Sequence, residues 1–410
     1  MPVASDLPEP DAVARAHSER LIAHIRSAIE SSGGRIAFSR YMDLALYAPG
    51  LGYYAGGAAK LGAAGDFVTA PEMTPLFARA LANQVAAILD ATRGREIVEL
   101  GGGTGRLAAD LLCALDVRDA LPSSYAILEV SPDLAARQRE TVFRRAPQHK
   151  DRVRWIDELP AAIDGALIAN EVLDAIACPL LTRTGGQWHE HGVRWVDAEN
   201  ESRGGFAWAD GPADPHLATL AAVRFPPVGD YTSEVNPAAE ALVEDVGRRM
   251  TGGAALFIDY GFPAAEYYHP QRDRGTLMCH YRHRAHGDPF AWPGLTDITA
   301  HVDFTAMAEA GERARLEVAG FTALAPFLIG CGILDALAAT GTPESVPYIR
   351  AAASVQKLLA LRNGRIVQGA GARKIGRDLV ARLRCGRPPA SLVTSPPTPP
   401  WKRRSPPEAS

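Results

Sequence analysis

Residues 96–107 read Glu-Ile-Val-Glu-Leu-Gly-Gly-Gly-Thr-Gly-Arg-Leu, an apolar strand that runs straight into closely spaced glycines. Glycines in such a place let the backbone approach a ligand. A P-loop would need a Lys and a Ser or Thr after the last glycine, but Arg106 and Leu107 follow Gly105. Arg106 also stands where a dinucleotide-binding loop has its third glycine. What remains is an acidic residue, an apolar residue and three alternating glycines: Glu99, Leu100, Gly101, Gly103 and Gly105.

This remaining pattern resembles motif I of the class I S-adenosylmethionine (SAM) methyltransferases. In that family the glycines let the backbone pass close to the methionine and ribose parts of a cofactor that carries no pyrophosphate. The resemblance implies that Gly101, Gly103 and Gly105 form the cofactor loop. It also implies that Glu99 accepts a hydrogen bond from the ammonium group of the cofactor, directly or through a water. A glycine-rich turn without a ligand is the alternative.

The sequence after residue 95 predicts an α/β fold, because short apolar runs alternate there with helical patterns. We expect a Rossmann-like class I methyltransferase sheet, with strands at residues 97–100, 125–130, 153–156, 165–169 and 254–258. Four segments follow one another along the chain, and the second carries two substrate-side insertions. They are a helical N-terminal unit with a Gly/Tyr-rich loop (1–92), the SAM-binding domain (93–335, insertions at about 178–230 and 262–312), a helical segment (336–383) and a disordered tail rich in Pro, Ser and Arg (384–410).

Composition narrows the classes of function. The formal net charge of −4 provides no basic field, which argues against broad nucleic-acid binding. Five scattered cysteines without CxxC spacing indicate reduced thiols and not a zinc site. No apolar run is long enough to cross a bilayer, and the acidic first residues match neither a secretory signal nor a mitochondrial presequence. We therefore expect a cytoplasmic protein without stable membrane insertion.

Carboxylates end the second and third predicted strands, where a cofactor on a parallel sheet would lie. Glu129 stands where a carboxylate would reach both ribose hydroxyls, although a Glu after a strand can also simply be solvated. Asp157 could accept a hydrogen bond from the adenine amine, or it could cap a helix.

The loop after the fourth strand faces the transferred methyl group in this fold. Asn170, Glu171 and Asp174 lie in it, and we predict that they are catalytic. Methyl transfer needs an oriented nucleophile that loses a proton, and two carboxylates suit a guanidinium or an amine. The alternative is that Glu171 caps a helix and Asp174 pairs with a surface Arg. Asp259 and Tyr260, after the fifth strand, would add to the same rim.

A His-rich segment follows at residues 275–286. Its His spacing matches no zinc signature and no cysteine pair accompanies it, so we expect no metal. A polar wall on the substrate side is one interpretation, and a structural hydrogen-bonded network is the other. The residues concerned are His280, Tyr281 and His283 in this segment, with Asp288, Asp297, His301 and Asp303 nearby.

Long motifs throughout the chain resemble the MidA-like family of class I SAM methyltransferases. They include GDFVTAPE, ELGGGTGRLAADLL, LEVSPDL, ANEVLDA and GLTDITAHVDFT, and the resemblance covers residues 15–360. Mitochondrial members are protein arginine methyltransferases that act in the assembly of respiratory complex I. The resemblance therefore implies SAM as cofactor and a protein substrate, with a complex I subunit as one candidate. It also implies that GDFVTAPE folds over the cofactor site and contributes Phe67, Thr69 and Glu72.

The resemblance stops near residue 360. Family members close with a helix reading about Met-Gly-Glu-Leu-Phe-Lys-Val, whereas Gln356-Lys357-Leu358-Leu359 is followed here by Arg-Asn-Gly-Arg-Ile-Val-Gln-Gly at 362–369. The codons CGG AAT GGG CGA ATT GTT CAA GGT, read one nucleotide on, would give Gly-Met-Gly-Glu-Leu-Phe-Lys. We therefore hypothesise a frameshift close to Ala360, which resequencing of the locus would test.

Three functions stay open at this point. The leading one is a SAM-dependent methyltransferase that acts on arginine in a protein of the bacterial cytoplasm. The second is a methyltransferase for a small molecule on the same fold. The third is a non-catalytic assembly chaperone that keeps a degenerate cofactor site. The methyl acceptor and the oligomeric state are not determined by the sequence.

Overall fold

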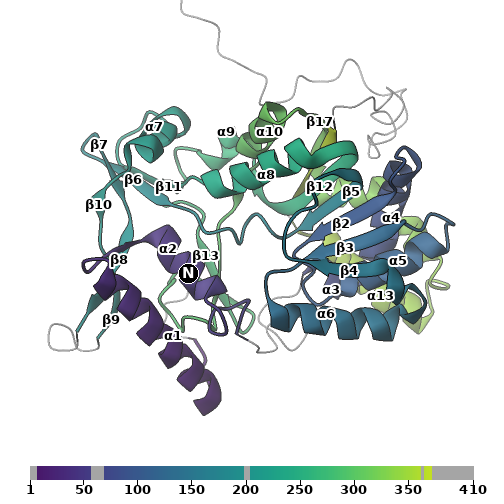
Figure 1. The fold of residues 1–410 in the computed structure, drawn as a ribbon, viewed down its shortest axis with the longest axis horizontal. Helices are drawn as coiled ribbons and strands as arrows, with labels where there is room; N and C mark the ends of the chain where they lie inside the picture. Colours follow the sequence, from purple (N-terminus) through teal and green to yellow (C-terminus); the bar gives the residue numbers. More distant parts are fainter. Residues whose placement is uncertain (1–6, 57–68, 198–203, 362–363, 372–410) are drawn as a thin grey trace, which may run out of the picture.

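The computed structural model describes residues 7–56, 69–197, 204–361 and 364–371. Phe67 and the predicted tail at 384–410 lie outside these ranges. A large sheet domain lies on the right in Figure 1, and a lobe that contains the first two helices lies on the left.

An eight-stranded sheet forms the centre of the sheet domain, and seven of its strands follow one another in the order β4-β3-β2-β5-β12-β18-β17, with β16 beside β12. The five strands from β4 to β12 pair in parallel, whereas β18 pairs antiparallel with β12 and β17. This arrangement confirms the predicted α/β class. The strands are β2 (Glu96–Leu100), β3 (Ser124–Leu128), β4 (Val153–Ile156), β5 (Ile163–Asn170), β12 (Met250–Phe262), β16 (Val302–Asp303), β17 (Leu316–Ala323) and β18 (Gly364–Gly371).

Helices cover both faces of this sheet because its strands are apolar on both sides. Ile97 of β2 packs into one buried cluster and the next residue, Val98, into the other. The first cluster is covered by α4 (Pro75–Asp90), α5 (Arg106–Asp116), α6 (Pro132–Arg145), α11 (Leu324–Gly330), α12 (Ile333–Ala338) and α13 (Val346–Leu359). The second is covered by α8 (Pro237–Arg249) and α10 (Phe304–Arg313).

The lobe on the left combines segments that lie far apart in the sequence (Figure 1). Buried side chains of the first two helices share one core with Cys279 and Ile298 of the second insertion. We call residues 7–56 together with β8 (Gly192–Val196) and β9 (Gly205–Trp208) the N-terminal lobe, whose other elements are α1 (Ala12–Ser31), α2 (Phe38–Tyr47) and β1 (Ile36–Ala37). The second insertion packs against it with β13 (Met278–Tyr281), β14 (Arg284–His286) and β15 (Asp297–Thr299).

The remaining elements are a further antiparallel sheet and several short helices. A four-stranded antiparallel sheet in the order β10-β7-β6-β11 lies above the N-terminal lobe in Figure 1. Its strands and the short helices are β6 (Leu180–Thr184), β7 (Gln187–Glu190), β10 (Gly211–Pro212), β11 (Tyr231–Glu234), α3 (Ala70–Met73), α7 (Pro215–Arg224), α9 (Ala264–Tyr267) and the 3-10 turn η2 (Pro147–Arg152).

Two segment boundaries differ from the sequence-based expectation. Residues 1–92 do not form one unit, because α4 buries Phe77, Leu81 and Val85 against the sheet and not in the N-terminal lobe. The segment 336–383 is not helical throughout, since residues 364–371 form β18 between β12 and β17. Ile366 and Val367 are buried on opposite faces of the sheet there, as a central strand requires. The frameshift near Ala360 stays a hypothesis.

Candidate active site

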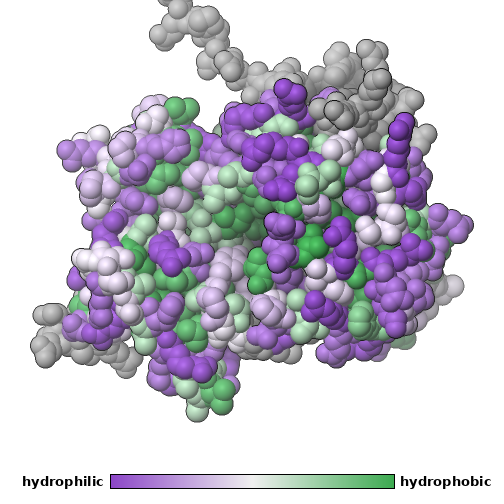
Figure 2. Space-filling view, in the orientation of Figure 1, coloured by the Kyte–Doolittle hydropathy of each residue, from purple (hydrophilic) through white to green (hydrophobic). Residues whose placement is uncertain are grey.

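A cavity of about 970 Å³ lies between the carboxyl ends of the central strands and the N-terminal lobe. Figure 2 shows a hollow with apolar side chains near the middle of this face, between the two bodies of the molecule. The volume is within the range of ligand-binding clefts. One end of the cavity is lined by the glycine loop and the other by residues of β13, β15 and the N-terminal lobe.

The glycine loop has a backbone that side chains would disturb. Gly101 and Gly105 have φ angles of 62° and 82°. A Cβ atom on Gly105 would lie 2.8 Å from Cα of Gln138, and one on Gly101 would lie 3.2 Å from the side chain of Val172. Gly101 and Gly103 line the cavity, whereas Gly105 begins α5 and packs against α6. The loop therefore presents bare backbone to the cavity.

Glu99 lies directly beneath this loop at the end of β2, only 2% exposed. Its Oε2 accepts a hydrogen bond of 2.8 Å from the hydroxyl of Tyr125 on β3. Burial raises the pKa of Glu99 to about 7; the Tyr125 hydrogen bond opposes this rise and the nearby charge of Glu129 adds to it. The carboxyl group lines the cavity, as a partner for a ligand ammonium group must.

Glu129, which follows β3, is anchored by two donors. Its oxygens accept hydrogen bonds from Ser131 N at 2.9 Å and Gln138 Nε2 at 2.7 Å. Gln138 also donates to Gly103 O at 3.1 Å and accepts from Trp155 Nε1 at 2.9 Å. This glutamine therefore ties the glycine loop to the predicted ribose carboxylate. Sequence reasoning missed it because a Gln within a helix carries no local signal.

Asp157, unlike Glu129, lies outside the cavity. It follows β4 as an exposed residue and is not among the residues that line the cavity. The described structure therefore does not bring it to the site, although it ends a strand of the same sheet.

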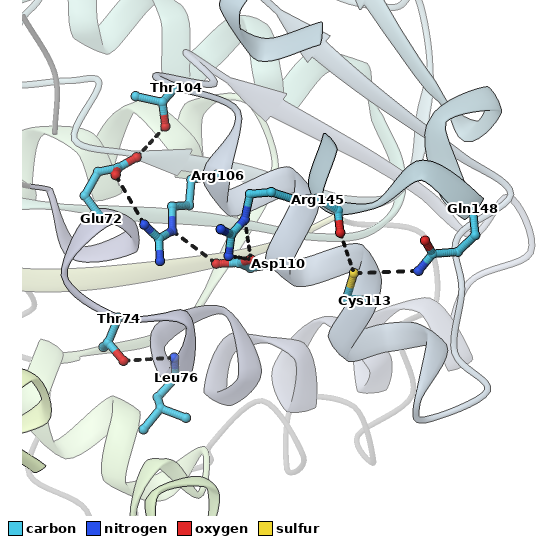
Figure 3. A network of polar contacts seen from close by, with 9 residues as sticks. All are labelled: Glu72, Thr74, Leu76, Thr104, Arg106, Asp110, Cys113, Arg145 and Gln148. Atoms are coloured by element: carbon cyan, nitrogen blue, oxygen red, sulfur yellow. Dashed lines mark hydrogen bonds and ion pairs between the residues drawn. The ribbon is translucent and has the colours of Figure 1, made fainter. Parts of the chain in front are cut away.

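The short helix α3 lies across the glycine loop, and Thr69 and Glu72 line the cavity there. Glu72 accepts a hydrogen bond from the hydroxyl of Thr104 and lies 3.7 Å from Nη1 of Arg106 (Figure 3). Arg106 contacts Asp110 at 3.4 Å, and Arg145 of α6 contacts the same carboxylate at 2.8 Å. Arg106, the residue that separates this loop from the dinucleotide-binding pattern, thus links α3 and α5 beside the glycine loop.

Asn170, Glu171 and Asp174 all line the cavity beyond the glycine loop. Glu171 has a φ angle of 56°, unusual for a residue other than glycine and common at functional sites. Its Oε1 accepts hydrogen bonds from Ala70 N at 3.2 Å and Asn170 Nδ2 at 3.3 Å. Burial raises the pKa of Glu171 to about 8, and the charges of Asp259 and Asp297 add to the rise. Burial and the same two charges also raise the pKa of Asp174.

Asp259 does not lie on the rim of the cavity, contrary to expectation. It is buried behind the loop after β5, where its Oδ2 accepts hydrogen bonds from Val172 N at 3.1 Å and Leu173 N at 2.8 Å. Asp259 therefore positions the loop that carries Glu171 and Asp174. The next residue, Tyr260, does line the cavity.

The His-rich segment is divided by strand alternation. His280 lines the cavity, whereas its neighbour Tyr281 packs into a small core on the other side of β13. His283 is exposed in the turn between β13 and β14. Asp303 is half-buried and caps α10, where it accepts hydrogen bonds from Thr305 N at 3.0 Å and Ala306 N at 3.2 Å. Only His280 of these four side chains lines the cavity.

Asp297 and His301, which the sequence places beside the His-rich segment as part of a polar wall, line the cavity from the second insertion. Tyr47 and Tyr54 of the N-terminal lobe and Thr299 also line it, and these three were not assigned to the site from the sequence. The tyrosines lie in the Gly/Tyr-rich segment that stands out in the sequence, but nothing local indicates which of them face the site.

The residues at the cofactor end fit the methionine part of SAM. Among the described residues, the buried Oδ1 of Asn170 has no hydrogen-bond partner, so it can accept from a bound ammonium group. Glu99 supplies a carboxylate in the same cavity, and the glycine loop supplies space. In the described part of the chain, no group of three or more His, Cys, Asp and Glu residues is placed to hold a metal ion. No helix within the described ranges is long and apolar enough to cross a membrane.

The sequence of this chain is similar to a family model and to proteins of animal mitochondria. A family model described as "putative S-adenosyl-L-methionine-dependent methyltransferase" matches residues 78–322. Protein arginine methyltransferase NDUFAF7, mitochondrial, of Danio rerio is 30% identical over 319 residues, which cover 70% of this chain and 71% of that protein. The NDUFAF7 of Homo sapiens is 28% identical over 314 residues, 70% of this chain and 67% of its own.

Two solved structures of Burkholderia thailandensis proteins are also similar. One, with S-adenosyl-homocysteine (SAH) bound, shares 47% identity and a TM-score of 0.86, and the match covers 92% of this chain and 98% of that one. The other shares 45% identity and a TM-score of 0.84 over the same proportions of the two chains.

Proposed function

The chain belongs to the family of SAM-dependent methyltransferases, and on that premise we propose that it methylates an arginine side chain in a protein. The relatives of about 30% identity carry the name protein arginine methyltransferase, which supports this acceptor. The cofactor is SAM, and a structural relative at 47% identity binds SAH, the product of methyl transfer.

The cofactor end of the cavity has the residues to hold SAM. We assign Gly101, Gly103 and Gly105 to the loop beneath it, Glu99 to its ammonium group and Glu129 to its ribose hydroxyls. When bound, SAM supplies an electrophilic methyl group on a sulfonium sulfur. The contribution of the chain is to bind and orient the acceptor beside that methyl group and to remove a proton from it.

The observation that carries the arginine proposal is a pair of carboxyl groups, the half-buried Glu171 and the buried Asp174, which line the cavity beyond the glycine loop. The charge of Glu171 raises the pKa of Asp174, and the charge of Asp297 raises the pKa of both. Buried carboxylates that face one another are unfavourable unless a cation or a proton neutralises them. A guanidinium supplies that cation and several N–H donors in one plane. A neutral acceptor would not offset the electrostatic cost of holding these ionised carboxylates close together.

Transfer to a guanidinium nitrogen forms an N–C bond, breaks a C–S bond and releases one proton. Glu171 is placed to take up that proton as a carboxylate, because it can exchange protons near neutral pH. Asp174 would hold the guanidinium in a fixed orientation through its remaining N–H groups. Asp259 keeps both residues in place through the loop backbone.

The acceptor protein itself is part of the proposal. The resemblance to the MidA-like family favours a subunit of respiratory complex I. The cytoplasmic location stays a prediction, which fractionation of the host cell would test.

The test is to incubate the protein with methyl-labelled SAM and host-cell lysate and to identify the products by mass spectrometry. We expect label on methylarginine residues of one or a few proteins, incorporated about 100-fold more slowly by a Glu171→Gln variant. Label on small molecules alone would favour the second function. A protein that binds SAH but transfers no methyl group to any lysate component would favour the chaperone.

A further inference from the structure

Asp297 lies in the second insertion, 126 residues along the chain from Glu171, yet both side chains line the same cavity. Strand alternation explains how it comes to face the site. Asp297 pairs directly with His280 across β13 and β15, and Thr299 pairs with Met278. Residues directly opposite in an antiparallel pair share one face, and all four of these side chains line the cavity.

The opposite face of the same strand pair is fixed in a core. Cys279 and Ile298 form the intervening pair and are buried, 0% and 1% exposed, among the side chains of α1 and α2. Because a slip of one residue would exchange the two faces, this core sets the register that directs Asp297 into the cavity.

The carboxylate of Asp297 is also held by a hydrogen bond from the N-terminal lobe. The hydroxyl of Tyr54 donates to Asp297 Oδ1 at 3.0 Å. The ring of Tyr54 stacks on that of Tyr47, with centroids 5.5 Å apart and planes at 23°. Tyr47 in turn donates to Ala175 O at 2.9 Å, next to Asp174. Two tyrosines thus connect Asp297 with the loop that carries the predicted catalytic residues.

Electrostatics favour a cationic ligand between these groups. The negative charge of Asp297 raises the pKa of Glu171, of Asp174 and of Tyr54. Among the described residues that line the cavity, Arg106 is the one arginine or lysine, and it pairs with Glu72 and Asp110 at the cofactor end.

We propose that Asp297 is a further acceptor-binding carboxylate, which selects a guanidinium over a neutral group of the same shape, and that Tyr54 is its positioning residue. This inference rests on the proposed arginine acceptor. It assigns a role in binding and specificity to the second insertion and the N-terminal lobe, whereas proton removal stays with Glu171.

The experiment measures binding of two small probes to the SAH-loaded protein. N-acetyl-arginine amide carries the guanidinium, and N-acetyl-citrulline amide has the same shape without the charge. We expect the wild-type protein to prefer the arginine probe at least about tenfold, because charge-assisted hydrogen bonds are the stronger kind. Asp297→Asn should reduce that preference by about tenfold and leave SAH affinity unchanged. Asp273→Asn, an exposed carboxylate of the same insertion, is the matched control and should keep the preference.

The outcomes separate this inference from the proposed function. A wild-type protein that binds both probes equally would overturn both. A wild-type preference that persists in Asp297→Asn would overturn the role of Asp297 alone. If Asp297→Asn no longer binds SAH, Tyr54→Phe decides, since it removes one hydroxyl and retains the stacked ring. A preference lowered about threefold in Tyr54→Phe supports the proposal, and an unchanged preference overturns it.

Discussion

At the cofactor end of the cavity the carboxylates of Glu99 and Glu129 accept hydrogen bonds from fixed neighbours, whereas at the acceptor end the charges of several carboxyl groups also raise one another's pKa. Glu99 is held by Tyr125, and Glu129 by Ser131 and Gln138. Glu171 also accepts two hydrogen bonds, but the charge of Asp297 raises its pKa, and the charges of Glu171 and Asp297 raise the pKa of Asp174.

This difference suggests two modes of recognition. The cofactor end is preorganised, so its affinity should depend on backbone shape and on groups that are already in place. The acceptor end stores an electrostatic cost that a cation relieves on binding, so its affinity should depend on charge and pH. Substitutions at the cofactor end should therefore lower the affinity for the cofactor, whereas substitutions at the acceptor end should change acceptor binding and its dependence on pH.

The largest effect is expected at the cofactor loop. Gly103 has a φ angle of 51° and lines the cavity, so Gly103→Val combines backbone strain with a side chain in the cofactor space. We expect SAH affinity, measured by calorimetry, to fall by more than about 100-fold. Gly186→Val is the matched control, because Gly186 has a φ angle of 80° in a turn with open space around it. If both variants lose the same SAH affinity, the loop is not the cofactor site.

A second effect separates chemistry from cofactor binding. Glu171→Gln keeps the shape of the side chain and removes its ability to take up a proton. We expect kcat to fall by about 100-fold while SAH affinity stays within about twofold. The exposed Glu309→Gln on α10 serves as the control. A variant that loses SAH affinity and kcat in equal measure would place Glu171 at the cofactor end and remove the contrast.

The third prediction concerns pH. The folded-state pKa of Glu171 is about 8, above its ordinary value of 4.5, so the native protein binds more protons than the unfolded chain between these values. The contribution of Glu171 to stability is therefore present at low pH and decreases as pH rises from about 5 to about 8. Glu171→Gln should lose this decrease. We expect its Tm, relative to wild type, to rise between pH 5.5 and pH 8.5.

Other buried carboxyl groups keep part of the pH dependence, so the comparison is between slopes. Glu309→Gln should retain the wild-type slope of Tm against pH. Parallel slopes for wild type and Glu171→Gln would mean that Glu171 is charged at neutral pH in the free protein, and that the acceptor end stores less electrostatic cost than we infer.

The smallest effect is expected where α3 contacts the glycine loop (Figure 3). Glu72→Gln keeps an acceptor for Thr104 and weakens the contact with Arg106. We expect SAH to dissociate about threefold faster in stopped-flow measurements, because partly exposed ion pairs contribute little. Glu140→Gln removes an exposed pair with Arg144 on α6 and should leave the rate unchanged. A large effect of Glu72→Gln would mean that α3 controls the cofactor site more than its contacts indicate.

Sequence reasoning grouped residues that line one end of the cavity because their signals are local. Glu99 lies near the end of β2 and Glu129 follows β3, and the carboxyl ends of parallel strands meet at one edge. The same reasoning placed Asp157 at the site, but the cavity does not extend to it. Tyr125 and Gln138, which hold the two carboxylates, escaped notice because a buried donor within a strand or helix has no distinctive spacing.

Sequence reasoning was weaker at the acceptor end for a physical reason. It grouped polar residues of the second insertion by proximity along the chain, and His280, Asp297 and His301 of that group line the cavity, whereas Tyr281, His283 and Asp303 do not. Asp303 caps a helix, and Asp259 supports the loop after β5 from behind. Burial, capping and exposure assign different roles to side chains of the same chemical type.

The sequence by itself determined the fold class and the cofactor loop, because strand, turn and helix within residues 96–116 fix which backbone approaches the ligand. Only the tertiary structure decided which side chains of the N-terminal lobe and the second insertion line the cavity. Tyr54 and Asp297 are 243 residues apart and meet across two separately built elements. Their contact depends on the packing of the second insertion against α1 and α2, and long-range packing of that kind leaves no pattern in either segment alone.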